Sequence, residues 1–252
     1  MNSSSKLNSK AFTQTLMLLK FNAIDRQNFY NELYHCGVSS TFIIALCGSF
    51  IGIVLTIQGI WTLEQFGANG KIGQFITLAI LRELGPVTTA LLFSGNVCTA
   101  TTSEIAVMKL TEQTHALKSI GINVYRFCYL PKMFATTISA TLLFNIFSIF
   151  SIAGSFGTAT LYFHMDSGSY WASIKNSLMP DDYYSGLLKI FVFAIAINLT
   201  AILFGINARQ SSTGIARSTT QCVITASILI FALDLILTYI LMKTTWLWRP
   251  ML

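Results

Sequence analysis

The stretch LRELGPVTTALLFSGN, residues 81–96, places an arginine, a glutamate and a Gly-Pro pair inside an otherwise apolar segment. Pro86 cannot donate a backbone hydrogen bond and its ring clashes with the preceding turn, so a helix is expected to kink or restart at Gly85-Pro86. In lipid, the carbonyl groups freed by such a break need polar partners, which places the break against protein or a water-filled cavity. Charges in a bilayer make the same demand.

The composition of the whole chain is that of an integral membrane protein. Apolar residues make up 53% of the 252 residues and charged residues only 10%, whereas a soluble domain carries about 25% charged residues. The net charge of +6 comes from basic residues scattered between apolar segments, a distribution that does not support nucleic-acid binding. The five cysteines show no paired spacing and are interpreted as small core residues, neither disulfides nor metal ligands.

Five segments are apolar enough to cross a hydrocarbon core about 30 Å thick, which takes about 20 helical residues. The sequence therefore predicts an all-α membrane protein with spans at Val38–Ile60, within Ile72–Met108, and at about Pro131–Phe163, Leu187–Ile206 and Cys222–Met242. Residues 11–35 mix apolar and basic side chains too evenly for a span, so an interfacial helix is expected there. The predicted organisation is an N-terminal cytoplasmic or interfacial segment, 1–37, followed by one transmembrane domain, 38–252.

The second span poses a problem of length, because a continuous helix over Ile72–Met108 would measure about 55 Å at 1.5 Å per residue. It cannot be one straight lipid-facing rod. Arg82 and Glu83 diverge around the helix, so each is expected to have a partner elsewhere. A cavity beside them is favoured by the Gly-Pro break, and snorkelling to the outer interface is the alternative. The Gly-x-x-x-Gly spacing of Gly48 and Gly52 is a weak packing signal.

Lysines and arginines in the connections predict the orientation, because basic residues are retained on the cytoplasmic side. One side carries Lys6, Lys10, Lys20, Arg26, Lys109, Lys118, Arg126, Lys132, Arg209 and Arg217, and the other carries Lys71, Lys175, Lys243 and Arg249. The N-terminus is therefore expected in the cytoplasm and the C-terminus outside.

The connection SEIAVMKLTEQTHALKSIGINVYRFCYLPK, residues 103–132, is too long for a simple turn and is patterned like an amphipathic helix. Its apolar positions are Ile105, Met108, Leu117 and Ile120, and its polar face is Lys109, Glu112 and Gln113. Gly121 offers a C-terminal stop. Such a helix can sit in a groove on a partner or lie on the bilayer.

These segments resemble a known family. LRELGPVTTALLFSGN followed by SEIAVMKLTEQTHALKSIGIN is similar to the signature of the MlaE (YrbE) permeases, the membrane subunits of ABC transporters that move phospholipids between bacterial membranes. The similarity continues through MDSGSYWASIKNS, STGIARSTTQCVI and FALDLILTYIL, so it covers about Tyr30 to Leu241. The family often has Gly-Arg where this chain has Gly95-Asn96, and Asp-Pro where it has Asn123-Val124.

The resemblance implies a homodimer in the inner membrane of a Gram-negative bacterium, with an interfacial helix before five spans in each subunit. It implies a cytoplasmic ABC ATPase that binds ATP, a STAS-domain protein and a periplasmic ring of MCE-domain proteins, with no catalysis and no cofactor in this chain. The connection would be the coupling helix on the ATPase, through Glu104, Lys109, Glu112, Gln113, Leu117 and Gly121. A phospholipid cavity open to the periplasm would be lined by Leu55, Gln58, Leu63, Phe66, Arg82 and Glu83.

The residues agree with that placement, since a phospholipid needs an apolar trough for its tails and a cationic contact for its phosphate, which Arg82 can supply. An intramembrane enzyme is disfavoured, because neither HExxH nor a Gly-x-Gly-Asp pair occurs, and the chain has no GxxxxGK[ST] motif for ATP. The stronger alternative is a stand-alone secondary transporter or channel with Arg82, Glu83 and Asp234 as an ion relay. Against this alternative, no inverted repeat is visible in the sequence. Asp234 is interpreted as a helix-packing residue bonded to a nearby hydroxyl, and a proton carrier is the alternative.

Overall fold

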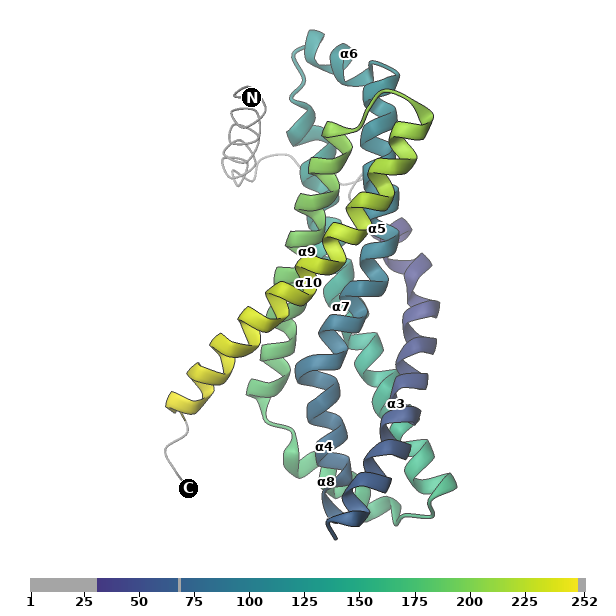
Figure 1. Ribbon diagram of the computed structural model, residues 1–252, viewed down its shortest axis with the longest axis vertical. Coiled ribbons are helices and arrows are strands. Elements are labelled where there is room, and N and C mark those ends of the chain that lie inside the picture. The colour runs from purple at the N-terminus through teal and green to yellow at the C-terminus, as the bar shows by residue number, and fades with distance from the viewer. Residues whose placement is uncertain (1–30, 68, 249–252) are drawn as a thin grey trace.

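The computed structural model describes residues 31–67 and 69–248, and within these ranges the chain is helical with no strand (Figure 1). Five helical stretches are long and apolar enough to cross a membrane: Asn31–Gln65, Ile72–Leu110, Tyr125–Tyr162, Pro180–Asn207 and Ser212–Lys243. The predicted all-α fold with five spans is confirmed. The expected interfacial helix, residues 11–35, lies almost wholly outside the described residues.

The helices follow one another with short connections. In chain order the elements are η2 (Tyr34–Val38), α3 (Ser39–Gln65), η3 (Asn69–Lys71), α4 (Ile72–Ala79), η4 (Ile80–Leu84), α5 (Gly85–Leu110), α6 (Gln113–Ser119), η5 (Tyr125–Tyr129), α7 (Leu130–Gly157), η6 (Thr158–Tyr162), α8 (Ser167–Ser177), α9 (Pro180–Asn207) and α10 (Ser212–Trp248). Of these, η2, η4 and η5 are π-helical turns that continue into an α-helix, and η6 is a π-helical turn that follows α7. The predicted boundary between residues 37 and 38 therefore falls within a continuous helix.

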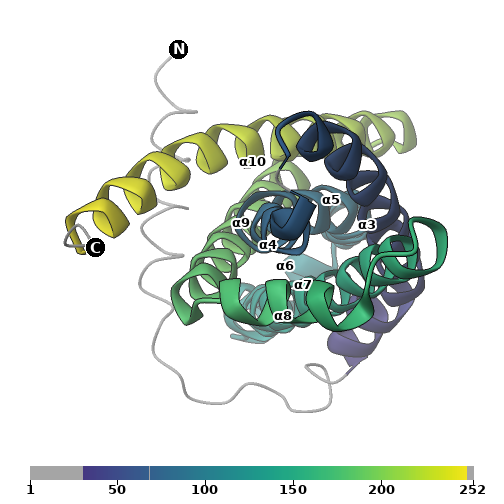
Figure 2. The same ribbon diagram turned by 90° about the horizontal axis from the view of Figure 1, so that it is seen from below.

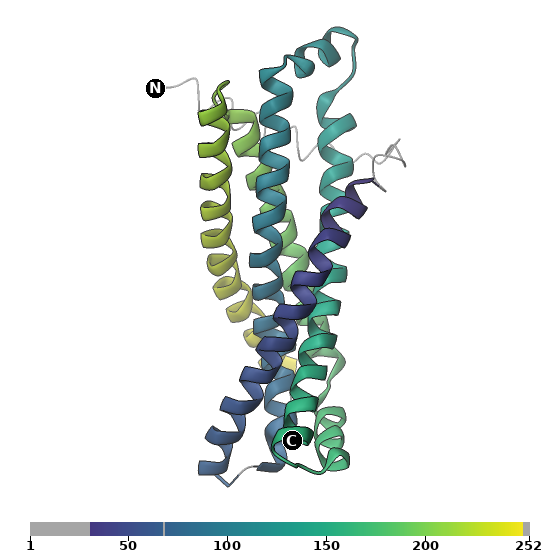
Figure 3. The ribbon, with the colours of Figure 1, turned by 90° about the vertical axis from the view of Figure 1, so that its right-hand side faces the viewer.

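The long helices form an elongated bundle whose two ends differ. α6 and the α9–α10 connection lie at one end, whereas α8 and the α3–α4 connection lie at the other (Figures 1 and 3). α5 contacts α7, α9 and α10, and the core contains the fully buried rings of Phe93, Phe144, Phe147 and Phe193. The C-terminal half of α10 diverges from the bundle, as the view along the long axis also shows (Figure 2).

Small residues bring α3 and α7 into close contact. A Cβ atom added at Gly52 would lie 2.0 Å from the backbone oxygen of Ser151, and one added at Gly154 would lie 2.7 Å from that of Ser49. Gly48 faces the backbone of Phe147 in the same way. The Gly-x-x-x-Gly spacing of the sequence therefore belongs to a contact within the subunit, where small residues let two backbones approach.

The second span continues as a helix through the predicted break, with an irregular turn beside it. α5 begins at Gly85 directly after η4, so Pro86 lies within a continuous helical stretch. The irregularity itself precedes the proline: η4 is a π-helical turn in which the Gly85 N–H donates to the Ile80 carbonyl, five residues back. Arg82 and Glu83 both lie in this turn.

The connection after the second span contains a shorter helix than the sequence pattern suggested. α5 continues to Leu110, so Ile105 and Lys109 belong to it, and the separate helix α6 covers only Gln113–Ser119. Glu112 adopts a left-handed conformation, φ 57°, immediately before α6. Gly121 follows it with φ 83°, a conformation that favours glycine, so the predicted stop is confirmed.

The close contact of α3 and α7 predicts the effect of one methyl group. Gly52→Ala should lower the free energy of unfolding by about 1–3 kcal/mol, because the added methyl meets a backbone oxygen that cannot move independently of α7. The midpoint of thermal unfolding of the full chain in mild detergent measures this. Gly157→Ala is the matched control, since no atom of another element lies within 4 Å of the place its methyl group would take. Equal midpoints for the two variants would contradict the packing described here.

Candidate functional site

The π-helical turn η4 carries two charged residues against α9. A Cβ atom added at Gly186 of α9 would lie 2.3 Å from the Leu81 carbonyl oxygen and 2.9 Å from the Phe144 ring. Only glycine permits this approach of the two backbones. Asp182 and Lys189 flank Gly186 on α9 at helical spacing, so the approach sets a carboxylate and an ammonium beside Arg82 and Glu83.

Arg82 pairs with Asp182. Its Nε atom lies 3.1 Å from Asp182 Oδ1, and the side chains are 34% and 5% exposed, respectively. Within the described part of the chain this is the only ion pair of the guanidinium, which leaves its terminal nitrogens available as donors. Arg82 is therefore an anchored cation with an open end, able to make a bidentate contact with an oxyanion.

Lys189 is the buried centre of a larger network that joins three helices. Its side chain is 2% exposed, and its Nζ atom lies 2.6 Å from Glu83 Oε2 and 2.9 Å from Asp234 Oδ1. Lys189 also donates to the Thr238 hydroxyl at 2.7 Å, and that hydroxyl lies 3.3 Å from Glu83 Oε2. Asp234 is thus paired with an ammonium group, and within the described residues its Oδ1 atom makes no hydrogen bond with a hydroxyl or any other donor.

The network of Arg82, Glu83, Asp182, Lys189 and Asp234 combines buried and open groups. Asp182 and Lys189 are buried, whereas the side chains of Arg82 and Glu83 are 34% and 44% exposed. Each charge has a partner of opposite sign, as charges within a membrane protein require. The open ends present a guanidinium and a carboxylate from neighbouring positions, which can receive the two charges of a zwitterionic group.

The four predicted lipid contacts on α3 lie on a separate element. Leu55 and Leu63 are partly buried and pack against the core, whereas Gln58 is exposed and Phe66, at the end of α3, is 78% exposed. This end of α3 lies against α4, where Gly59 faces Ile76. In the described residues no hydrogen bond or ion pair links these four side chains to Arg82 or Glu83, so their role as cavity lining stays a prediction.

The six predicted coupling residues divide between two elements. Glu104 and Lys109 lie on α5, where Glu104 pairs with the buried Lys132, and Lys109 donates to the Ile206 carbonyl at 2.8 Å. The remaining four lie in or beside α6: Glu112, Gln113, Leu117 and Gly121. Leu117 packs against a small cluster at the ends of α5 and α7. The exposed face at this end of the bundle is therefore formed by α6, and its coupling role stays a prediction.

Sequence reasoning missed two members of the network, Asp182 and Lys189. Lys189 lies within a predicted span, so the cost of burying its charge was a signal that could have identified it. Asp182 lies just before that predicted span, among residues that read as an exposed connection. The structure places it in the first turn of α9, where a carboxylate is favoured by the helix dipole.

Comparison with known proteins identifies the family. A family model described as Permease MlaE matches residues 29–240. The chain belongs to the MlaE permease family. It is 38% identical over 211 residues to the intermembrane phospholipid transport system permease protein MlaE of Haemophilus influenzae, covering 83% of this chain and 81% of that protein. It is also 30% identical to probable ABC transporter permeases of Pyropia yezoensis, over 94% of this chain and 90% of the relative, and of Rickettsia felis, over 84% and 82%.

Two asparagines of this MlaE-family permease stand where the family often has other residues, and both have defined contacts. Asn96 donates through Nδ2 to the Ser40 hydroxyl at 2.8 Å, which ties α5 to α3. Asn123 accepts the backbone N–H of Tyr125 at 3.1 Å, at the beginning of the helix that leads into α7. Both departures therefore support local structure.

The network predicts a large loss of stability when its central cation is removed. Lys189→Met should destabilise the permease by about 3–5 kcal/mol, because Glu83 and Asp234 are left without their common partner. Thermal unfolding in detergent measures the effect, with the exposed Lys175→Met as control. Adding Glu83→Gln and Asp234→Asn to Lys189→Met should recover most of the loss. If the losses of stability caused by the three substitutions simply added up, the two carboxylates would not depend on Lys189 as described.

Proposed function

We propose that this chain is the permease subunit of an ABC transporter that moves phospholipids between the inner and outer membranes of a Gram-negative bacterium. The observation that carries the proposal is Arg82: a half-buried guanidinium, anchored by Asp182, with its terminal nitrogens free for a phosphate. Membership of the MlaE family and the phospholipid transport system to which the Haemophilus influenzae relative belongs support a phospholipid substrate. Arg82 receives the phosphate, while Glu83 remains with Lys189.

The proposed lipid cavity opens to the periplasm between two copies of the chain. Its lining is Leu55, Gln58, Leu63, Phe66, Arg82 and Glu83. η4 begins only eight residues after the start of α4, or about 12 Å of helix from the α8 end. The basic residues support an N-terminus in the cytoplasm and a C-terminus in the periplasm, because the α6 end of the described bundle carries more lysines and arginines than the α8 end.

The energy for transport comes from partner subunits in this proposal. A cytoplasmic ABC ATPase binds and hydrolyses ATP, a STAS-domain protein accompanies it, and MCE-domain proteins form a ring on the periplasmic side. α6 transmits the motion of the ATPase, since it projects beyond the long helices at the end assigned to the cytoplasm (Figure 1). The relatives named as probable ABC transporter permeases support this reading over a secondary transporter or channel that works alone.

The role of Arg82 predicts a change in lipid retention. Arg82→Ala should weaken phospholipid binding about ten- to a hundredfold, since a hydrogen bond to a charged group contributes about 1.5–3 kcal/mol. Phospholipid that copurifies with the chain, measured by mass spectrometry, reports the loss. Asp182→Asn is the matched control, because it breaks the same ion pair but leaves the guanidinium. Unchanged lipid content in Arg82→Ala would exclude Arg82 as the phosphate ligand.

The coupling role of α6 predicts a selective loss of the ATPase. Ala116 is exposed on α6, so Ala116→Arg should leave the fold intact while its bulk and charge prevent close docking. Coelution of the ATPase with the purified permease is the measurement. Ala172→Arg supplies the control, because Ala172 is an exposed alanine of α8 at the opposite end. If both variants retain the ATPase equally, docking does not involve this face of α6.

A further inference from the structure

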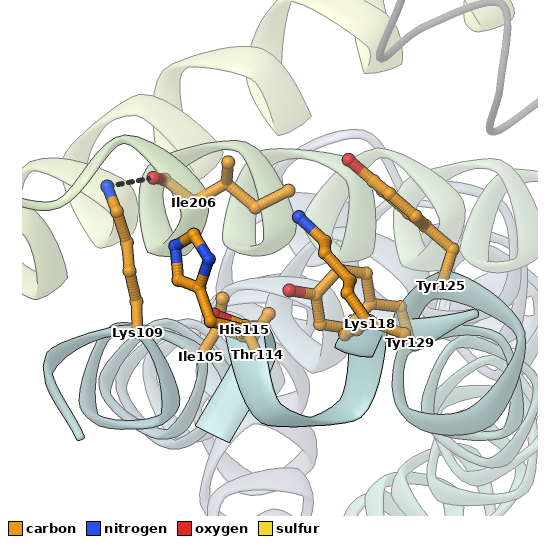
Figure 4. A pocket seen from close by; sticks show the side chains of 9 residues that line it. Ile105, Lys109, Thr114, His115, Lys118, Tyr125, Tyr129 and Ile206 are labelled. Atoms are coloured by element: carbon orange, nitrogen blue, oxygen red, sulfur yellow. Dashed lines mark hydrogen bonds between the residues drawn. The ribbon is translucent and has the colours of Figure 1, made fainter. Parts of the chain in front are cut away.

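A pocket lies between α6, η5 and the adjoining ends of α5 and α9, far along the bundle from the ion-pair network. Its volume is about 130 Å³, and its polar lining comes from Lys109, Thr114, His115, Lys118, Tyr125 and Tyr129. Figure 4 shows these side chains directed into the same space from separate elements. Apolar side chains, among them Ile105 and Ile206, form the rest of the wall.

Several hydrogen-bonding groups in this pocket are unused. Within residues 31–67 and 69–248, the side chains of Thr114, His115 and Lys118 and the hydroxyls of Tyr125 and Tyr129 have no hydrogen-bond partner. Tyr129 is only 6% exposed, and its hydroxyl points into the pocket (Figure 4). Donors without a partner that face the same space can bind a polar group that enters it.

The lining selects the charge of that group. No aspartate or glutamate is among the residues that line the pocket. Lys109 already donates to the Ile206 and Ala208 carbonyls, at 2.8 Å and 3.2 Å, so it neutralises the C-terminal end of α9. Lys118 is the other lysine that lines the pocket. The hydroxyls beside it can donate to the oxygens of a group that Lys118 binds. The pocket is therefore built to receive an oxyanion.

We propose that this pocket binds the phosphate of an anionic phospholipid headgroup. Its volume corresponds to about four water molecules at about 30 Å³ each, which is enough for a tetrahedral phosphate but not for a whole lipid. Basic pockets between helices at the end of a membrane span are suited to lipid headgroups. Two exposed apolar residues of the same connection, Ile122 and Phe127, provide surface for the apolar part of such a lipid. The site is separate from the proposed transport cavity, which lies toward the α8 end.

The reactivity of Lys118 toward an amine-acylating reagent tests this proposal. The full chain is reconstituted in nanodiscs of phosphatidylcholine alone, or of equal parts phosphatidylcholine and phosphatidylglycerol, and labelling of each lysine is followed by mass spectrometry. The anionic lipid should slow labelling of Lys118 about fivefold, the factor that corresponds to one lysine at an anionic surface. Lys175, exposed on α8, is the reference for general effects of reconstitution.

The variant Tyr129→Phe separates a bound headgroup from a general surface effect. It keeps every charge and removes one donor in the pocket, so the protection of Lys118 should largely disappear. Undiminished protection in this variant would overturn the proposal, as would equal labelling in both kinds of nanodisc. Protection by inorganic phosphate in phosphatidylcholine nanodiscs would make the ligand a free phosphate and overturn its assignment to a lipid. If labelling of Lys118 slowed only when the ATPase was added, whichever lipid was present, the occupant of the pocket would be a protein side chain and the proposal would be overturned.

Discussion

The structure depends on one buried ammonium group. Lys189 brings a positive charge into the interior of an apolar bundle, where an unpaired charge would cost several kcal/mol. Glu83 and Asp234 satisfy it from the second and fifth spans, so one side chain ties three helices together. The pairing is possible only because Gly186 lets α9 touch the backbone of η4. The pairing of these charges therefore depends on the glycine.

Hydropathy predicts where the spans lie but not where their helices end. The fourth span was expected at Leu187–Ile206, whereas α9 covers Pro180–Asn207. The length of an apolar segment reflects the thickness of the hydrocarbon core. The helix that contains this segment can extend past the hydrocarbon, where its polar residues find partners. Asp182 and its ion pair lie in that extra turn. In the same way α5 extends to Leu110, which shortens the helix expected in the following connection.

The candidate site could be predicted only in part. A charged residue in an apolar segment indicates that a partner is needed, but the sequence does not show which residue that partner is. Arg82 and Glu83 stood out beside a Gly-Pro pair in an apolar run. Their partners lie about 100 residues further along the chain or more, and only the fold brings them together. The aromatic and lysine side chains of the pocket beside α6 are likewise ordinary in the sequence. They matter because the fold brings their unpaired hydrogen-bond donors into one pocket, and the sequence does not show how the helices pack.

A second buried lysine joins helices at the α6 end of the bundle. Lys132 lies at the α6 end of α7 and pairs with Glu104 of α5 and, at 3.3 Å, with Glu32 of the first span. α6 has no buried residue of its own, so the ends of α5 and α7 determine its position. Because α5 is one helix from Gly85 to Leu110, α6 and η4 lie at its two ends. In the proposed coupling, a force on α6 would pass the turn at Glu112 and then follow α5 to Arg82 and Glu83, where the π-helical turn is the next irregular backbone.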